Sequence, residues 1–170
     1  MLNNTNKIIL GIDPGLNVTG YGLIKFDNFN INYLYGGYIY CGKLYHLYDK
    51  LKLIYNTIYN ITNRFLPNYI VIEKIFVSKN ADTAIKLGHA RGVAIAAIVN
   101  FNIPLFEYTA KQVKKIIVGK GSANKLQVKY TICKLLNLKI SLKLDVTDAL
   151  AIAVTHCYNI KSSDKITNNY

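Results

Sequence analysis

The sequence is short of acidic residues, and this shortage sets the first limit on what the protein does. Only nine of its 170 residues are Asp or Glu, against 21 Lys or Arg, which gives a formal charge of +12 and a pI near 9.6. A strongly basic chain favours polyanionic partners, nucleic acid before a membrane surface. The chain is also rich in Ile, Asn, Lys and Tyr, whose codons are rich in A and T. Part of the lysine excess is therefore open to a compositional explanation, and the charge supports a nucleic-acid partner without deciding for one.

Cysteine and long apolar runs are also scarce. The three cysteines, Cys41, Cys133 and Cys157, are widely spaced and form no C-x-x-C, which argues against a disulfide framework and a zinc site. The alanine-rich stretch GVAIAAIV is far shorter than the ~20 residues of a membrane span. Asp13 interrupts the N-terminal apolar run that a signal peptide would need. We therefore expect a soluble, cytoplasmic protein with no membrane partner.

Proline occurs three times, and no proline-rich linker, repeat or low-complexity block divides the chain. With 170 residues, of which 51% are hydrophobic, the chain is long enough to bury one core of its own. We expect a single domain over residues 1–160, followed by a flexible tail over residues 161–170.

The first third of the chain has the pattern of a β-meander followed by a helix. Three strand-like segments, KIILGID, TGYGLIKFD and INYLYGGYIY, are joined by short turns that suit antiparallel pairing. Apolar residues at three- and four-residue steps then predict a helix from Lys43 to about Phe65, which Pro67 closes.

Strands and helices alternate in the rest of the chain, which is typical of parallel strands. The apolar run YIVIE predicts a strand covered on both faces, and IPLFEY predicts another. A capping box, Thr109-Ala110-Lys111-Gln112, opens a helix after the second of them. The other expected helices are about Asn80 to Phe101, Asn124 to Asn137 and Asp145 to Tyr158. The fold class is therefore α/β, with a mixed five-stranded sheet flanked by helices.

Four of the nine acids fall where such a sheet would gather them. Asp13 ends the first strand and Glu73 ends the fourth, and parallel neighbours bring their carboxyl ends to one edge, where open α/β sheets bind ligands. Asp145 and Asp148 lie three residues apart, on one face of the last helix, and can point at the same edge. We expect these four carboxylates to lie close together.

Such a cluster repels itself and is costly to bury unless cations neutralise it. Oxygen ligands without a nearby His or Cys constellation favour Mg²⁺ or Mn²⁺ over zinc. Two such ions ~4 Å apart are a known device for phosphodiester cleavage, in which one activates a water and the other stabilises the leaving oxygen. A basic surface around an acidic metal pocket indicates a nuclease.

Four segments resemble the successive motifs of the RuvC-type Holliday junction resolvases. They are GIDPGLNVTGYG, IEKIFVSKNADTAIKLGHARGVAIAA, FEYTAKQVKKIIVGKGSANKLQV and DVTDALAIAVTHC, and the similarity runs from about Ile8 to Tyr158. The resemblance implies a ribonuclease H-like fold and an endodeoxyribonuclease that nicks two strands of a four-way junction. It implies two Mg²⁺ ions per active site, with Mn²⁺ as a substitute. Carried over position by position, the catalytic and metal-binding residues are Asp13, Glu73, Asp145 and Asp148.

The same resemblance assigns residues to DNA binding and to assembly. Phe76 matches an aromatic residue that works at the junction centre, and Lys79, in the same motif, is assigned to DNA as well. Lys114 and Lys125 match basic positions near the scissile phosphate. The helix containing LGHARGVAIAA resembles the segment through which two subunits pair, which implies a homodimer. The branch-migration proteins RuvA and RuvB are the implied protein partners.

Two other functions stay open on the sequence. A junction-binding clamp without catalysis would need the same basic surface, although the presence of all four acids argues against it. An actin-like nucleotide-binding domain also opens with GIDPG and a meander, but it needs about twice this length and a second phosphate motif. Asp13 in a turn, or Asp145 and Asp148 at a helix N-terminus, would also be stable without any metal.

Overall fold

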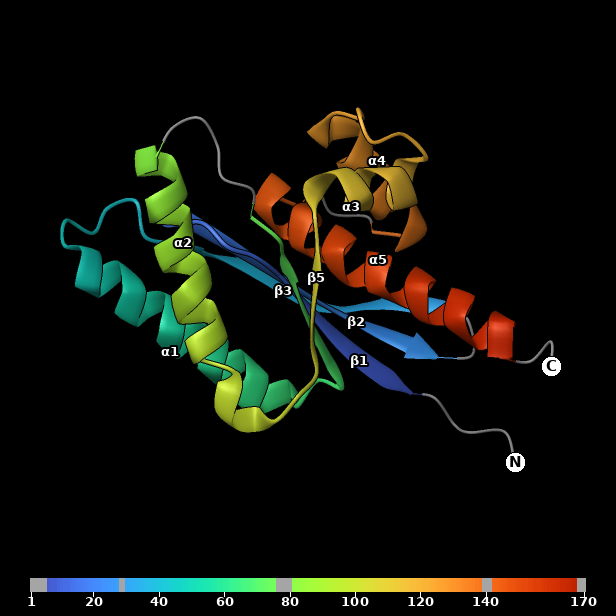
Figure 1. The fold of residues 1–170 in the computed structure, drawn as a ribbon, viewed down its shortest axis with the longest axis horizontal. Coiled ribbons are helices and arrows are strands. Elements are labelled where there is room, and N and C mark those ends of the chain that lie inside the picture. The colour runs from blue at the N-terminus through green and yellow to red at the C-terminus, as the bar shows by residue number, and fades with distance from the viewer. Residues whose placement is uncertain (1–5, 28–29, 76–80, 139–141, 168–170) are drawn as a thin grey trace.

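A mixed sheet of five strands forms the centre of the molecule (Figure 1). The computed structural model describes residues 6–27, 30–75, 81–138 and 142–167. Strands β1 (Lys7–Asp13), β2 (Val18–Asp27) and β3 (Asn30–Tyr40) form the antiparallel meander. Strands β4 (Tyr69–Glu73) and β5 (Leu105–Tyr108) continue the sheet in parallel with β1, in the order β3-β2-β1-β4-β5. The predicted strand arrangement is confirmed.

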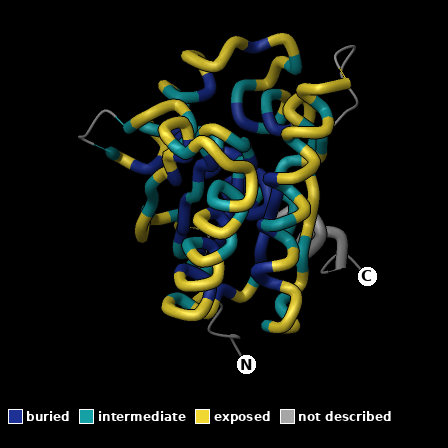
Figure 2. Tube along the Cα trace, turned by 90° about the vertical axis from the view of Figure 1, so that its left-hand side faces the viewer, coloured by how far each residue is buried: buried dark blue, intermediate teal, exposed yellow. Residues whose placement is uncertain are grey.

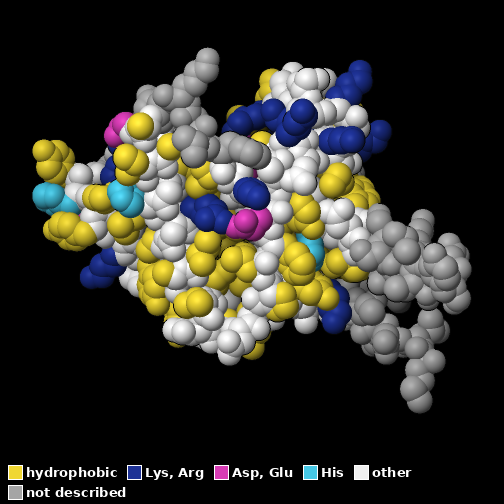
Figure 3. Space-filling model, in the orientation of Figure 1, with side chains coloured by type: hydrophobic (Ala, Val, Ile, Leu, Met, Phe, Trp, Pro, Cys, Tyr) yellow, Lys and Arg dark blue, Asp and Glu magenta, His cyan; other side chains and the backbone are white. Residues whose placement is uncertain are grey.

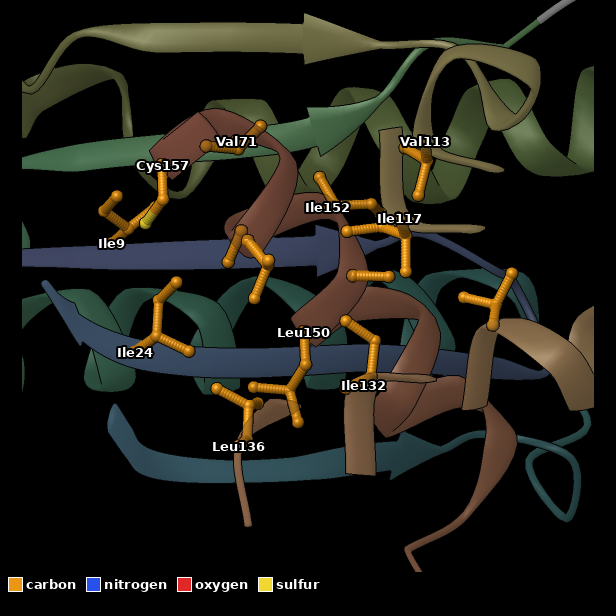
Figure 4. Close-up of a cluster of buried hydrophobic side chains, with 14 of the residues drawn as sticks. Ile9, Ile24, Val71, Val113, Ile117, Ile132, Leu136, Leu150, Ile152 and Cys157 are labelled. Atoms are coloured by element: carbon orange, nitrogen blue, oxygen red, sulfur yellow. The ribbon is translucent and has the colours of Figure 1, made fainter. Parts of the chain in front are cut away.

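Helices cover both faces of the sheet, and the period-two alternation of the strands decides which residues each face buries. Helices α1 (Leu47–Phe65) and α2 (Ala81–Ala96), followed by the 3₁₀ turn η1 (Val99–Phe101), pack on the face that presents Leu10 and Ile12. Helices α3 (Ala110–Val118), α4 (Lys125–Leu135) and α5 (Leu144–Thr167) pack on the face that presents Ile9. Figure 4 shows this second cluster, in which Leu150 of α5 lies near Ile132 of α4 and Ile152 of α5 lies near Ile117 of α3.

The helices differ from the prediction mainly at their ends. Helix α1 begins at Leu47 rather than Lys43, because Leu44 keeps the apolar period inside a turn in which its N–H bonds the carbonyl of Cys41 at 3.1 Å. Helix α2 ends at Ala96 and tightens into η1, so the predicted helix to Phe101 is too long. The predicted capping box at Thr109 is confirmed.

Helix α5 continues to Thr167, seven residues into the stretch expected to be a tail. The chain has no Gly or Pro between residues 145 and 167, so nothing local stops a helix that packing has already nucleated. The expected tail is thereby reduced to residues 168–170, which lie outside the described residues.

Glycines bring α5 directly against the backbone of β1 and β2. A Cβ on Gly11 would overlap the carbonyl oxygen of Ala149 and lie 3.0 Å from the nitrogen of Ala153. A Cβ on Gly20 would overlap the carbonyl oxygen of Asp145 in the same way. The two glycines lie on neighbouring strands and on the same face of the sheet. Together they fix how close α5 lies to the sheet and in which direction it runs. In Figure 2 the exposed residues lie on the outer coils of the trace, and the buried residues lie inside.

His156 is a core side chain of α5. It is 3% exposed, its ring lies 4.2 Å from that of Phe106, and its Nδ1 lies 2.9 Å from the hydroxyl of Tyr108. Burial lowers the pKa of His156 to about 4, so the ring is neutral at physiological pH.

Replacing Gly11 tests how tightly α5 lies on the sheet. Gly11→Ala is expected to cost about 1–3 kcal/mol or more of unfolding free energy, because the new methyl group must displace the backbone of Ala149. Urea unfolding measures the change. The matched control is Asn60→Ala, at an exposed position on α1, where the gain in helix propensity is at most about 1 kcal/mol. Equal stability of the two variants would contradict the close contact.

Candidate active site

The register of the sheet places Asp13 and Glu73 side by side. Strands β1 and β4 pair in parallel up to Ile12 opposite Ile72, and the next step sets Asp13 opposite Glu73. Neighbouring strands are about 4.8 Å apart, and the two carboxyl groups are joined by a side-chain hydrogen bond. Both side chains are half-buried at the carboxyl edge of the sheet.

Asp13 holds a proton far more tightly than an ordinary carboxyl group. Burial is the largest cause of its raised pKa, followed by the hydrogen bond and the negative charge of Glu73 and then by the charge of Asp148, while Lys125 opposes the shift. Loss of the Asp13 proton is therefore unfavourable in this structure, and a positive charge beside the two carboxyl groups would relieve it.

Asp148 is neutralised by an ammonium group instead. The Nζ of Lys125 lies 3.0 Å from the Oδ2 of Asp148, whose side chain is only 16% exposed. Lys125 is the first residue of α4, and the capping box formed by Asn124 and Gln127 fixes that end of the helix. The hydrogen bond to Asp148 is the main cause of the raised pKa of Lys125, and the charges of Asp148, Asp13 and Glu73 add to it. One lysine thus faces three acids.

Asp145 joins this group through its backbone. Its carbonyl oxygen packs on Gly20, which is the cross-strand partner of Asp13, so Asp145 lies at the same edge of the sheet, one turn before Asp148. Within the described ranges, no hydrogen bond or ion pair links the carboxylate of Asp145 to the other three acids. The structure therefore brings Asp13, Glu73 and Asp148 into electrostatic contact and leaves Asp145 beside them.

The donor set fits a hard divalent cation, but it is not preassembled as a cage. In the part of the chain that the structure describes, no three Asp, Glu, His or Cys side chains are arranged to hold one ion. The raised pKa of Asp13 and the ion pair of Asp148 both indicate that negative charge at this edge is unfavourable unless a cation lies near it. Oxygen ligands alone suit Mg²⁺ or Mn²⁺. A bound divalent ion would favour the ionised form of Asp13 and would compete with Lys125 for Asp148.

Basic side chains surround the acids. A cleft of about 630 Å³ is lined by Asp13 and Glu73 together with Lys74, Lys111 and Lys114. Lys114 and Lys125 also line a smaller cavity of about 100 Å³ next to Asp148. Helices α3 and α4 with their connection, residues 110–135, contain seven lysines and no acid, and Figure 3 shows Lys and Arg side chains gathered over these helices.

The structure describes two of the four residues expected to contact DNA. Lys114 and Lys125 lie at the acidic site, whereas Phe76 and Lys79 lie outside the described residues. Two lysines of the cleft, Lys74 and Lys111, were not identified from the sequence. A signal was available for both, since Lys74 follows Glu73 directly and Lys111 lies one helical turn before Lys114.

Comparisons with known proteins agree on one family. The family model described as crossover junction endodeoxyribonuclease RuvC matches residues 9–156. The chain is 52% identical over 152 residues to the protein of that name from Citrobacter koseri, covering 89% of this chain and 87% of that protein. It is 49% identical over 160 residues to the one from Wigglesworthia glossinidia brevipalpis, covering 94% and 99%.

Solved structures agree with the sequence comparisons. Thermus thermophilus RuvC in complex with a Holliday junction substrate superposes with a TM-score of 0.85 at 26% identity, over 92% of this chain and 96% of that one. The yeast mitochondrial Holliday junction resolvase Ydc2 shares the fold alone, with a TM-score of 0.52 at 14% identity, over 91% of this chain and 80% of that one. The expected ribonuclease H-like fold is confirmed.

Replacing the carboxyl group of Asp13 by an amide is expected to stabilise the metal-free protein. The pKa of Asp13 in the folded state lies above its usual value of 3.8, so its protonation stabilises the fold at low pH, and this contribution is lost as the pH rises through the folded pKa. At neutral pH in EDTA, Asp13→Asn should therefore melt at a higher temperature than the unmodified chain. Thermal unfolding measures this.

The control is Asp49→Asn, which removes an acid from the first turn of α1, where negative charge favours the helix. It should melt at the same temperature as the unmodified chain or slightly lower. A lower melting temperature for Asp13→Asn in EDTA would show that the carboxyl group is not strained by its surroundings.

Proposed function

The chain belongs to the RuvC family of crossover junction endodeoxyribonucleases, and we propose that it resolves Holliday junctions by paired, metal-dependent nicks during recombination and repair. The observation that carries the proposal is that Asp13, Glu73 and Asp148, from three separate elements, meet at the carboxyl edge of the sheet below a lysine-lined cleft. An acidic centre inside a basic surface suits hydrolysis of a phosphodiester.

The four acids would hold two Mg²⁺ ions, for which Mn²⁺ would substitute. When bound, such ions lower the pKa of an attacking water and stabilise the charge of the leaving oxygen. Asp13 would coordinate in its ionised form, and the ions would compete with Lys125 for Asp148. Lys125 and Lys114 both line the cleft and would be available to the phosphate. In-line attack would leave a 5′-phosphate and a 3′-hydroxyl.

The lysines of the cleft and of α3 and α4 would supply most of the affinity for DNA. Contacts to phosphates release counterions, so affinity should fall steeply with salt and depend little on base sequence. Selection of a four-way junction would then come from its shape and from the spacing of two active sites. RuvA and RuvB are proposed as partners, and the cytoplasm as location, on family membership alone.

Helix α2 supports a homodimer. The segment Ala81–Phe101 is long and apolar enough to span a membrane by composition, yet only 22% of its most apolar 18-residue stretch is buried. Composition is weak evidence for a span, and Arg91 in this segment pairs with Glu107 of β5, which ties the helix to the sheet. A Cβ on Gly88 or Gly92 would meet nothing within 4 Å. The same helix of a second copy would cover this surface, and the two-fold symmetry would match a substrate with two equivalent strands.

The two other functions are weaker. A clamp without catalysis leaves unexplained why three acids are brought together at a cost in stability. An actin-like nucleotide-binding domain is disfavoured because the match to the nuclease family covers residues 9–156.

Cleavage of a synthetic four-way junction tests the proposal. With Mg²⁺ the protein should introduce paired nicks in two strands, and EDTA should abolish them. Asp13→Asn should lose nicking by at least about 10³-fold, because it removes a ligand of the catalytic ions, while it binds the junction as well as before or better. Asp49→Asn, on α1, should nick normally. Paired nicks by Asp13→Asn would contradict the assigned centre, and nucleotide turnover in place of nicking would favour the actin-like function.

The dimer has its own test at Ile85, whose side chain on α2 is 59% exposed. Ile85→Asp should convert a dimer into a monomer, because it would bury an unpaired charge between the two helices. Light scattering coupled to size-exclusion chromatography measures the mass. The control is Leu53→Asp, on the outer side of α1, where the side chain is 38% exposed and the dimer should persist. A monomeric unmodified chain, or a dimer that survives Ile85→Asp, would contradict this interface.

A further inference from the structure

Lys143 and Tyr38 lie together on the β3 side of the acidic site. The proposed function gives neither residue a role. The Nζ of Lys143 lies 3.8 Å from the centroid of the Tyr38 ring, within the range of a cation–π interaction. Lys143 is exposed and Tyr38 is 40% exposed. The contact joins the residue before α5 to the end of β3.

The strand pairing shows how far Tyr38, which contacts Lys143, lies from Asp13. Tyr38 pairs with Gly20, and Gly20 pairs with Asp13. Two strand spacings put the Cα atoms of Tyr38 and Asp13 about 10 Å apart. Paired residues point to the same face of a sheet, and at Gly20 this is the face that carries Asp145. Tyr38 therefore lies beside the acidic centre, on the side opposite to β4 and the lysine-lined cleft.

The stability of the fold does not account for either residue. The carbonyl of Lys143 accepts the N–H of Thr147 at the start of α5, and a cation is unfavourable at that end of a helix. No ion pair between Lys143 and an acid is found in the described ranges of the chain. Tyr38 belongs to neither hydrophobic cluster. An exposed cation held over an exposed ring beside a nuclease centre is suited to a ligand.

We propose that Lys143 binds a backbone phosphate of the DNA strand that is cut, and that Tyr38 positions its ammonium group for this contact. The inference rests on the proposed function and extends it to the opposite flank of the site. Successive phosphates of a strand are spaced about 3.4 Å along the helix axis, so a strand with one phosphate at the acids passes this flank within a few nucleotides. The ring restrains a flexible side chain in advance, which lowers the entropy lost on binding.

Binding to a four-way junction in EDTA, measured as a function of salt, tests Lys143. Lys143→Met should weaken binding roughly 5- to 10-fold at 0.1 M salt and reduce the slope of log K against log salt by about 0.9, the value for one phosphate contact. Lys143→Gln should behave in the same way. The control is Lys52→Met, which makes the same charge change at an exposed position on α1, over the other face of the sheet, and should leave both quantities unchanged.

Tyr38 is tested as a positioning residue. Tyr38→Phe keeps the ring and should bind as tightly as the unmodified chain, whereas Tyr38→Leu should lose part of the affinity that Lys143→Met loses. Because Tyr38 acts through Lys143, Tyr38→Leu should have no further effect in the Lys143→Met background. Circular dichroism confirms folding of each variant.

Three other outcomes would each contradict a different part of these proposals. If the unmodified chain nicks the junction and both Lys143 variants bind with an unchanged salt slope, this inference is wrong and the proposed function stands. If Tyr38→Leu equals Tyr38→Phe, or weakens the Lys143→Met variant further, the positioning role of Tyr38 is wrong. If the unmodified chain neither binds nor nicks the junction, the proposed function fails, and this inference fails with it.

Discussion

The contact between α5 and the glycines of β1 and β2 is the constraint on which the rest of the structure depends. Gly11 and Gly20 leave no room for a Cβ beneath the backbone of α5, so the helix packs closer to the sheet than larger side chains would permit. This close packing brings the N-terminal turn of α5 to the carboxyl edge of β1 and β4. Asp148 then faces Asp13 and Glu73, which no local sequence preference could achieve.

Charge balance at this edge explains how a fold tolerates acids that it has gathered. Burial and the neighbouring acids raise the pKa of Asp13, and Asp148 pairs with the ammonium group of Lys125. Both effects reduce the negative charge at this edge of the sheet, as a bound divalent cation would do. Gathering these acids costs stability at Asp13. Lysines surround the acidic centre, so that the rim of the site is basic.

The sequence predicts the framework of the site better than its details. Asp13 and Glu73 could be placed because each directly follows an apolar run, and the ends of parallel strands coincide. The ion pair of Lys125 and Asp148 could not, because the two residues are 23 positions apart and meet only once α4 has folded back over α5. The contact of Tyr38 with Lys143 is equally non-local. Leu44 shows the limit of periodicity, since its apolar side chain fits the helix pattern while its backbone forms a turn.

The central claim is that carboxylates from three separate elements form one cation-binding pocket. A crystal soaked in Mn²⁺ and measured at the manganese absorption edge tests it most directly. The account predicts anomalous density at about 2.0–2.2 Å from carboxylate oxygens of Asp13 and Glu73, with the ammonium group of Lys125 displaced from Asp148. The absence of density between the carboxyl groups at saturating Mn²⁺, with Lys125 still paired with Asp148, would contradict it.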